Sequence, residues 1–176
     1  MRALGPGSVS SFLKIILDVS YYVLWIWVSL LALVTILVLL LSFNTDLLTS
    51  ILPSELAEPL AKNGPGSAAA LAGWALMSGG WMAIVERLRK IFATMTLGDP
   101  FHPENVRRLR VVGGILAALE VGRYVFAALT RVLIDGEKVV DGSFTLNAWF
   151  SVLVVFVLAE VFREGARLRR EAELTI

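Results

Sequence analysis

The chain has 176 residues, of which 57% are hydrophobic and 18% are charged. Soluble domains are about half apolar and about a quarter charged, so this composition argues against a soluble enzyme and against a disordered chain. The chain has no cysteine, which excludes disulfides and thiolate catalysis, and a single histidine, which excludes histidine-rich metal or haem sites. The net charge of +1 does not support direct nucleic-acid binding.

The first predicted element is a membrane-spanning helix over residues 19–43. The 27 residues between Asp18 and Asp46 carry no charge, and a bilayer core of about 30 Å needs roughly 20 apolar residues in a helix. This run is too long for the apolar region of a cleaved signal peptide, and no small-residue cleavage site follows it. We therefore expect the segment to remain as a membrane helix.

Residues 44–66 are predicted to form the longest external loop. Pro53, Pro59 and the Gly64–Gly66 run are expected to break it into short pieces. Apolar side chains near its beginning favour a short stretch lying against the membrane surface; they are Leu47, Leu48, Ile51 and Leu52.

A second span is predicted over residues 67–86, within the 23 uncharged residues that follow Lys62. The helical pattern continues into the cytoplasmic loop 87–109, where Gly98 is expected to stop the helix. The prolines of the LGDPFHP turn hold the chain extended, and Pro103 and Glu104 suit the first turn of a new helix. His102 is expected to be a turn or capping residue. The loop is thus predicted to be two protruding helices joined by a rigid turn.

The third span, residues 110–132, contains two charged residues, Glu120 and Arg123. Glu120 lies ten residues into the span, or roughly 15 Å deep, where an unpaired charge costs about 2.5–3.5 kcal/mol. The two residues are three apart on one helical face and are predicted to form an intramembrane ion pair. Two roles stay open: a structural pair, or a proton or ion relay in a small transporter.

The fourth span is predicted over residues 144–163, preceded by a short external turn, DGEKVVDGS, that resembles a hairpin. The tail 164–176 is compatible with an amphipathic helix that continues this span. Together the segments predict a single all-α integral membrane domain, a bundle of four transmembrane helices with helical cytoplasmic extensions.

The distribution of basic residues predicts the orientation. Of the 16 lysines and arginines, 12 lie in the N-terminal segment, the loop 87–109 with Arg110, and the C-terminal tail with Arg163. Short cytoplasmic loops collect basic residues, so both termini are predicted to be cytoplasmic.

Small residues at four-residue spacing predict where the second and third spans pack. The stripes are Ala75, Gly79 and Ala83 on one, and Gly114, Ala118 and Gly122 on the other. Packing within one chain and a dimer interface both remain open. Charged residues at the cytoplasmic ends of the spans suggest a salt-bridge belt, or alternatively snorkelling side chains or a docking surface; they are Asp18, Glu86, Arg87, Arg89, Glu160 and Arg163.

Two cytoplasmic motifs carry a resemblance to a known family. The loop contains Pro100, Phe101, Asn105, Arg108, Leu109 and Arg110, and the tail contains Phe162, Gly165, Leu168, Glu171, Leu174, Thr175 and Ile176. This pair of motifs resembles the bacterial four-helix membrane proteins of domain-of-unknown-function family 2975. The resemblance implies location in the bacterial inner membrane. Members are often encoded beside a small helix-turn-helix regulator, which implies such a regulator as a cytoplasmic partner.

Two functions are therefore expected as alternatives. The first is a regulatory interaction protein that binds a helix-turn-helix regulator through Pro100, Phe101, Asn105, Arg107, Arg108, Arg110, Gly165, Leu168 and Glu171. The second is a small transporter or channel component that uses Glu120 and Arg123. Membrane lipids and a homo-oligomer are further expected partners. We expect no enzymatic activity, cofactor or metal, because no nucleophile lies near a base and no ligand cluster is present.

Overall fold

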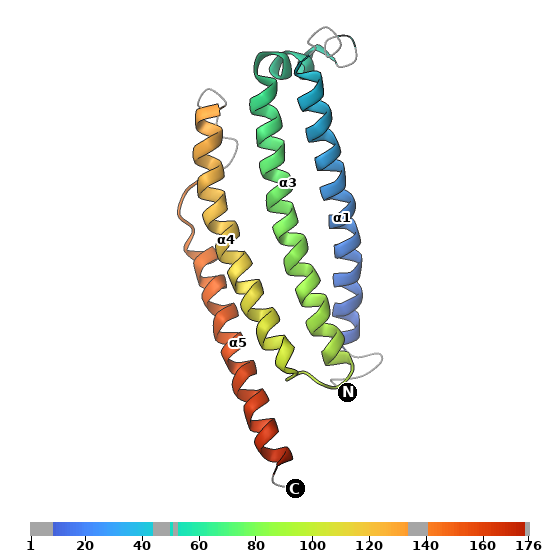
Figure 1. Ribbon diagram of the computed structural model, residues 1–176, viewed down its shortest axis with the longest axis vertical. Coiled ribbons are helices and arrows are strands. Elements are labelled where there is room, and N and C mark those ends of the chain that lie inside the picture. The colour runs from blue at the N-terminus through green and yellow to red at the C-terminus, as the bar shows by residue number, and fades with distance from the viewer. Residues whose placement is uncertain (1–8, 44–49, 51–52, 134–140, 175–176) are drawn as a thin grey trace. The chain divides into compact units, whose positions relative to one another are not determined.

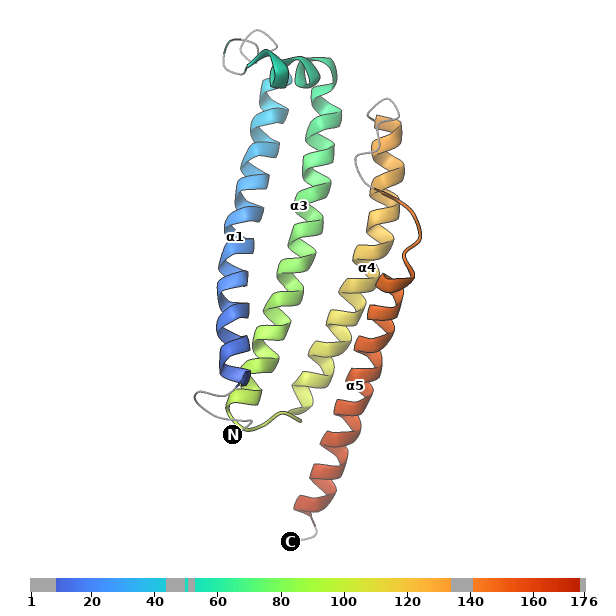
Figure 2. The same ribbon diagram turned by 180° about the vertical axis from the view of Figure 1, so that it is seen from behind.

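The computed structural model describes residues 9–43, 50, 53–133 and 141–174. Every regular element in these residues is an α-helix (Figure 1 and, from behind, Figure 2). The helices are α1 (Val9–Leu41), α3 (Ser54–Thr96), α4 (Pro103–Leu133) and α5 (Leu146–Glu173). Each is long and apolar enough to cross a membrane. The prediction of an all-α protein with four such helices is confirmed, and the four predicted spans overlap these helices.

Among the described part of residues 44–66, the predicted break beside the Gly64–Gly66 run is confirmed, whereas the predicted break at Pro59 is wrong. Helix α3 begins at Ser54 and passes through Pro59, and its backbone leaves the helical region at Asn63 (φ −145°, ψ 54°). The Asn63 side-chain oxygen accepts a hydrogen bond from the Gly66 amide at 3.2 Å. Asn63 therefore caps the helix that follows, and Pro65 falls in its first turn, where a missing N–H costs little. The apolar residues Leu47, Leu48, Ile51 and Leu52, and most of the second external turn, lie outside the described residues.

By their contacts, the residues divide into two compact units. Unit 1 contains residues 1–24, 80–120 and 145–176, and unit 2 contains residues 25–79 and 121–144. Helices α1, α3 and α4 each contribute a segment to both units, whereas α5 belongs to unit 1.

In unit 2, α3 packs on α4 through glycines. A β-carbon on Gly73 would collide with the Phe126 ring, and one on Gly122 would lie 2.9 Å from Met77 Cε. Thr130 is buried and its hydroxyl donates to the Phe126 carbonyl at 3.0 Å. The absence of a side chain at these glycines lets the two helices approach closely.

The predicted small-residue stripes are confirmed at Gly122, which packs against Met77, and are wrong at Gly79 and Gly114. Nothing lies within 4 Å of the place where a β-carbon would stand on Gly79 or Gly114, whereas one on Gly80 would lie 2.5 Å from Leu119 Cδ2. Helices α3 and α4 are neighbours, as expected, but Gly73 and Gly80 form the close contacts rather than Gly79. Four-residue spacing indicates that small residues share one face of a helix, but it does not indicate which face meets the neighbouring helix.

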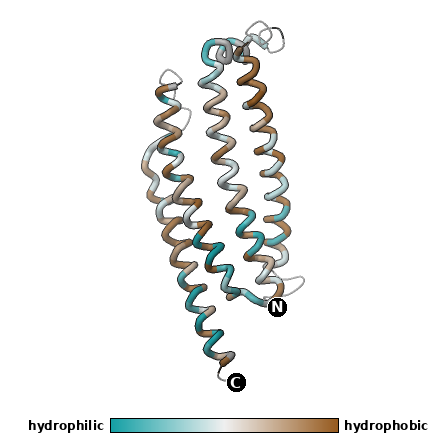
Figure 3. Tube along the Cα trace, in the orientation of Figure 1, coloured by the Kyte–Doolittle hydropathy of each residue, from teal (hydrophilic) through white to brown (hydrophobic). Residues whose placement is uncertain are grey.

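In unit 1, the ends of α3 and α5 and the beginning of α4 share a small core. Ile91, Leu109 and Ala159 are buried, and Leu88, Met95 and Phe162 pack around them. Figure 3 shows that the first turns of α4 and the last turns of α5 are mostly hydrophilic, whereas the middle of each helix is mostly hydrophobic. This polar end of unit 1 carries both sequence motifs.

Candidate functional site

The turn between α3 and α4 has a defined backbone. Gly98 adopts a positive φ of 84°, a conformation that costs glycine little and other residues more. The Gly98 amide donates to the Met95 carbonyl and the Asp99 amide to the Thr94 carbonyl, both at 3.0 Å. These bonds satisfy the last carbonyls of α3, so the expected helix stop at Gly98 is confirmed.

Asn105 locks this turn from inside. Its side chain is fully buried, and its amide nitrogen donates to Thr94 Oγ1 at 2.7 Å and to the Pro100 carbonyl at 3.1 Å. Its side-chain oxygen accepts from Arg108 Nη1 at 2.9 Å. One buried amide thereby joins the end of α3, the turn and the first turn of α4. A buried polar group whose hydrogen bonds are all satisfied fixes the segments that it connects.

His102 caps the beginning of α4. Its Nδ1 accepts a hydrogen bond from the Glu104 amide at 3.2 Å, which satisfies one of the unpaired N–H groups of the first helical turn. The expectation that His102 is a turn or capping residue is confirmed.

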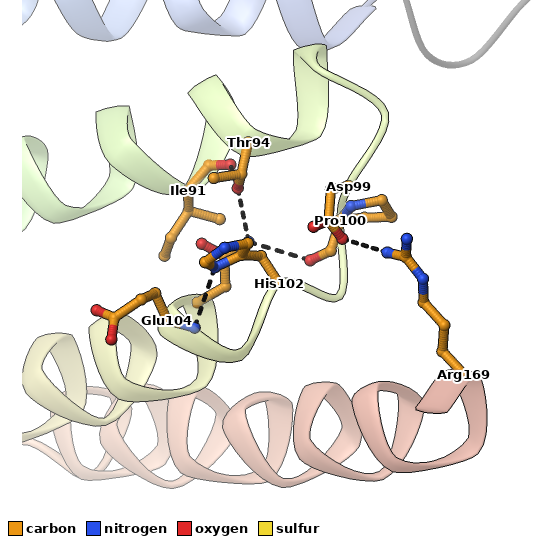
Figure 4. Close-up of polar contacts among 8 residues, drawn as sticks. Ile91, Thr94, Asp99, Pro100, His102, Glu104 and Arg169 are labelled. Atoms are coloured by element: carbon orange, nitrogen blue, oxygen red, sulfur yellow. Dashed lines mark hydrogen bonds and ion pairs between the residues drawn. The ribbon is translucent and has the colours of Figure 1, made fainter. Parts of the chain in front are cut away.

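The turn is also attached to α5. The Phe101 ring lies 5.6 Å, centre to centre, from the Phe162 ring, and a β-carbon on Gly165 would lie 2.5 Å from Phe101 Cε1. Arg169 forms an ion pair with Asp99 (Figure 4). We call these five residues, Asp99, Phe101, Phe162, Gly165 and Arg169, the loop–tail clasp. The clasp brings the two sequence motifs together and fixes α5 against the turn.

Beside the clasp, α4 and α5 enclose a groove of about 700 Å³, which we call the tail groove. Its walls combine apolar and basic side chains with two acids; they are Pro103, Val106, Arg110, Arg163, Glu164, Ala166, Arg167, Arg170, Glu171 and Leu174. Arg167 is paired with Glu164 at 2.5 Å and with Glu171 at 3.7 Å. Arg170 has no charged or hydrogen-bonding partner among the described residues. The groove is therefore partly apolar and carries a positive excess.

The charges expected to form a belt are paired. Asp18 of α1 binds Arg89 of α3 at 2.5 Å, and the Arg89 guanidinium lies 4.4 Å from the centre of the Tyr21 ring. Arg110 of α4 lies 3.9 Å from Glu160 of α5. Two of the pairs thus join neighbouring helices, whereas the pairs Glu86–Arg87 and Glu160–Arg163 lie within one helix.

Glu120 and Arg123 each have partners of their own. Glu120 is 8% exposed and accepts a hydrogen bond from Thr145 Oγ1 at 3.2 Å. Arg123 donates to the backbone carbonyls of Asp141 and Ser143, the latter at 2.7 Å, and its guanidinium lies 5.0 Å from the centre of the Tyr124 ring. The ion pair between Glu120 and Arg123 stays a prediction.

The structure distributes the nine candidate partner-binding residues over three places. Pro100, Phe101, Asn105, Arg108 and Gly165 are engaged in the turn and the clasp. Arg110 and Glu171 line the tail groove, Arg107 lines a smaller pocket described below together with Arg108, and Leu168 is 55% exposed. Sequence reasoning did not single out Val106, Arg163 or Leu174 as groove residues, because they belong to the groove through the packing of α4 on α5.

The exposed side chains of α1 indicate which solvent surrounds the helices. Trp25, Ile26 and Leu33 are each more than half exposed, an arrangement that is unfavourable in water and favourable in lipid. Among the described residues, no cluster of three or more histidines or acids is placed to hold a metal ion. The fold defines a multi-pass α-helical membrane protein.

A comparison with known protein families matches residues 19–176 to the family described as a protein of unknown function, DUF2975. The chain belongs to this family, as its two motifs indicated. No curated protein and no solved structure matches it significantly.

Proposed function

We propose that this chain is a regulatory interaction protein of the bacterial inner membrane, with both termini in the cytoplasm. Its tail groove binds an amphipathic helix with acidic side chains on a small helix-turn-helix regulator. The tail groove carries the proposal: it combines apolar and cationic walls at the polar end of unit 1. The proposal includes no catalytic step and no cofactor.

The lining of the groove favours a peptide helix with both apolar and acidic residues. Val106, Ala166 and Leu174 offer apolar contacts, and Leu174 is 83% exposed in the free chain. The Arg170 guanidinium has no partner among the described side chains and is available for a charge-assisted hydrogen bond to a carboxylate. A helix laid into a groove with anchors spaced along one face is a common mode of peptide recognition.

The clasp supports the same proposal because it fixes the groove before a partner arrives. Phe101 packs on Phe162 and Gly165, and Asp99 pairs with Arg169, so the turn holds α5 in position beside α4. A preformed groove loses little conformational entropy when it is filled.

The proposed orientation rests on the distribution of basic residues, of which 12 of 16 lie in the N-terminal segment, the loop with Arg110 and the tail with Arg163. A phosphatase reporter, active only outside the cytoplasm, should be inactive when fused after Ile176 and active when fused within residues 134–140. An active reporter after Ile176 would reverse the orientation.

The binding proposal is tested by co-purification. The full chain is co-expressed with the helix-turn-helix regulator expected to be encoded beside it, and the complex is isolated in mild detergent. Arg170→Gln combined with Arg110→Gln should lower the amount of regulator recovered by about tenfold, because each charged hydrogen bond contributes about 1.5–3 kcal/mol. Arg131→Gln is the matched control: it removes an exposed arginine of unit 2, outside the tail groove.

Undiminished recovery with the double variant would remove the tail groove from the proposal. Recovery of a second copy of the chain in place of the regulator would favour a homo-oligomer.

A further inference from the structure

A second, smaller cavity of about 230 Å³ lies between the end of α3 and the beginning of α4. Its lining holds four basic side chains and one acid, with a single valine; the residues are Arg87, Lys90, Glu104, Arg107, Arg108 and Val111. We call it the α3–α4 pocket. It is separate from the tail groove and shares no lining residue with it.

The positive charge of this pocket is only partly neutralised from within the chain. Lys90 binds Glu86 at 2.5 Å, and Arg87 lies 3.6 Å from the same carboxylate. Arg107 has no partner among the described residues. The pocket therefore retains a cationic excess that favours an anion.

Arg108 is held in place within the pocket by uncharged groups. Its Nη1 donates to the Lys90 carbonyl at 3.1 Å and to the Asn105 side-chain oxygen at 2.9 Å. Neither acceptor cancels the charge of the guanidinium, and both fix its orientation. The remaining donors of Arg108 are thus preorganised for a ligand, and a guanidinium matches the geometry of phosphate oxygens.

The position of the pocket along α3 and α4 indicates which kind of phosphate compound it binds. On α3, only Glu86 separates Arg87 from the uncharged run that ends at Val85, and on α4, Val111 begins the uncharged run that extends to Leu119. The pocket lies where the apolar part of both helices ends, which is the level of the lipid headgroups. Basic pockets between membrane helices at this level are suited to anionic headgroups.

We infer that the α3–α4 pocket binds the phosphate of an anionic phospholipid, held by Arg87, Lys90, Arg107 and Arg108, with the acyl chains leaving past Val111. This inference is independent of the proposed partner, because the two sites have different residues. A lipid phosphate bound there bridges the two helices on either side of the turn.

The test is a titration of the purified full chain followed by native mass spectrometry. Dioleoylphosphatidylglycerol is the probe, and dioleoylphosphatidylcholine is the zwitterionic comparison. Arg87→Gln combined with Arg107→Gln should weaken phosphatidylglycerol binding by about tenfold or more, since two charged hydrogen bonds are lost. The matched control, Arg167→Gln with Arg170→Gln in the tail groove, removes the same charge and should bind like the wild type.

Two further measurements keep the inference testable. Arg107→Lys keeps the charge and should retain most of the binding, which separates a lost contact from a misfolded chain. Glycerol 1-phosphate tests for a soluble ligand: if it displaces the lipid at equal concentration, the headgroup alone is recognised and the lipid assignment is overturned. Equal binding of both lipids, or unchanged binding by the Arg87→Gln and Arg107→Gln variant, also overturns it.

Discussion

The ring of Phe101 occupies the space in which any side chain on Gly165 would have to sit. A β-carbon built on Gly165 would lie 2.5 Å from Phe101 Cε1, closer than two carbon atoms can approach. The two residues come from the two separate sequence motifs, so the glycine in the tail and the aromatic residue in the loop are explained by one contact.

Gly165→Val should therefore destabilise the chain. Overpacking a close contact costs about 1–3 kcal/mol, and we expect a lower thermal midpoint in detergent, followed by circular dichroism. Gly114→Ala is the control, because nothing lies within 4 Å of its β-carbon position and alanine favours a helix over glycine by about 0.5–1 kcal/mol. Equal midpoints for Gly165→Val and the wild type would show that the clasp is not formed.

Asn105→Ala should loosen the turn between α3 and α4. The variant loses the amide that donates to Thr94 Oγ1 and to the Pro100 carbonyl, and an unsatisfied buried acceptor costs about 1–3 kcal/mol. Limited proteolysis should then cut within residues 97–102 faster than in the wild type. Asn147→Ala, at an exposed position of α5, should leave the cleavage rate unchanged; a similar rise in both variants would contradict the locking role.

The pair between Asp18 and Arg89 should contribute modestly to stability. The side chains are 33% and 25% exposed, and exposed ion pairs are worth about 0.2–1 kcal/mol. A double-mutant cycle with Asp18→Asn and Arg89→Gln, measured by denaturation in mixed micelles, should give a coupling energy near the upper end of this range. A coupling energy of zero at low salt would mean that the two side chains do not interact in solution.

Glu120→Gln should fold like the wild type, because an amide oxygen can still accept the hydrogen bond from Thr145 Oγ1. Thr145→Val removes the donor and should cost about 1 kcal/mol, measured by the thermal midpoint. The same Glu120 variant tests the alternative function: proton uptake into vesicles by the wild type that disappears in Glu120→Gln would favour a transporter. Vesicles with wild-type chain that take up no protons would remove that alternative.

The helices could largely be predicted from the sequence, because the residues that determine them are close together in the chain. Long uncharged runs between Asp18 and Asp46, and between Lys62 and Glu86, are required by a bilayer and are visible in the sequence. The helix stop at Gly98 and the cap at His102 also follow from neighbouring residues. The passage of α3 through Pro59 was missed because a proline inside a helical pattern usually ends or kinks the helix, whereas the break beside Gly64–Gly66 was expected and occurs at Asn63.

The sequence indicated which two motifs belong to the candidate site, but it did not indicate what each residue of the motifs does there. Both motifs lie at one end of unit 1, but Phe101 and Asn105 stabilise the turn and do not line the tail groove. Which helix face meets a neighbour depends on the packing of segments far apart in sequence. The same cause placed the close α3–α4 contacts at Gly73 and Gly80 rather than at Gly79.

The turn between α3 and α4 also limits how the molecule can be altered. Loops between membrane helices are the customary places to insert an epitope or a fluorescent protein, and they tolerate changes in length during evolution. Here Gly98 fixes the exit from α3, Asn105 fixes the entry into α4, and Asp99 and Phe101 are held by α5 between them. One added or deleted residue would displace at least one of these anchors. The spacing from Gly98 to Asn105 is therefore as constrained as the identity of the residues within it, and tags belong elsewhere in the chain.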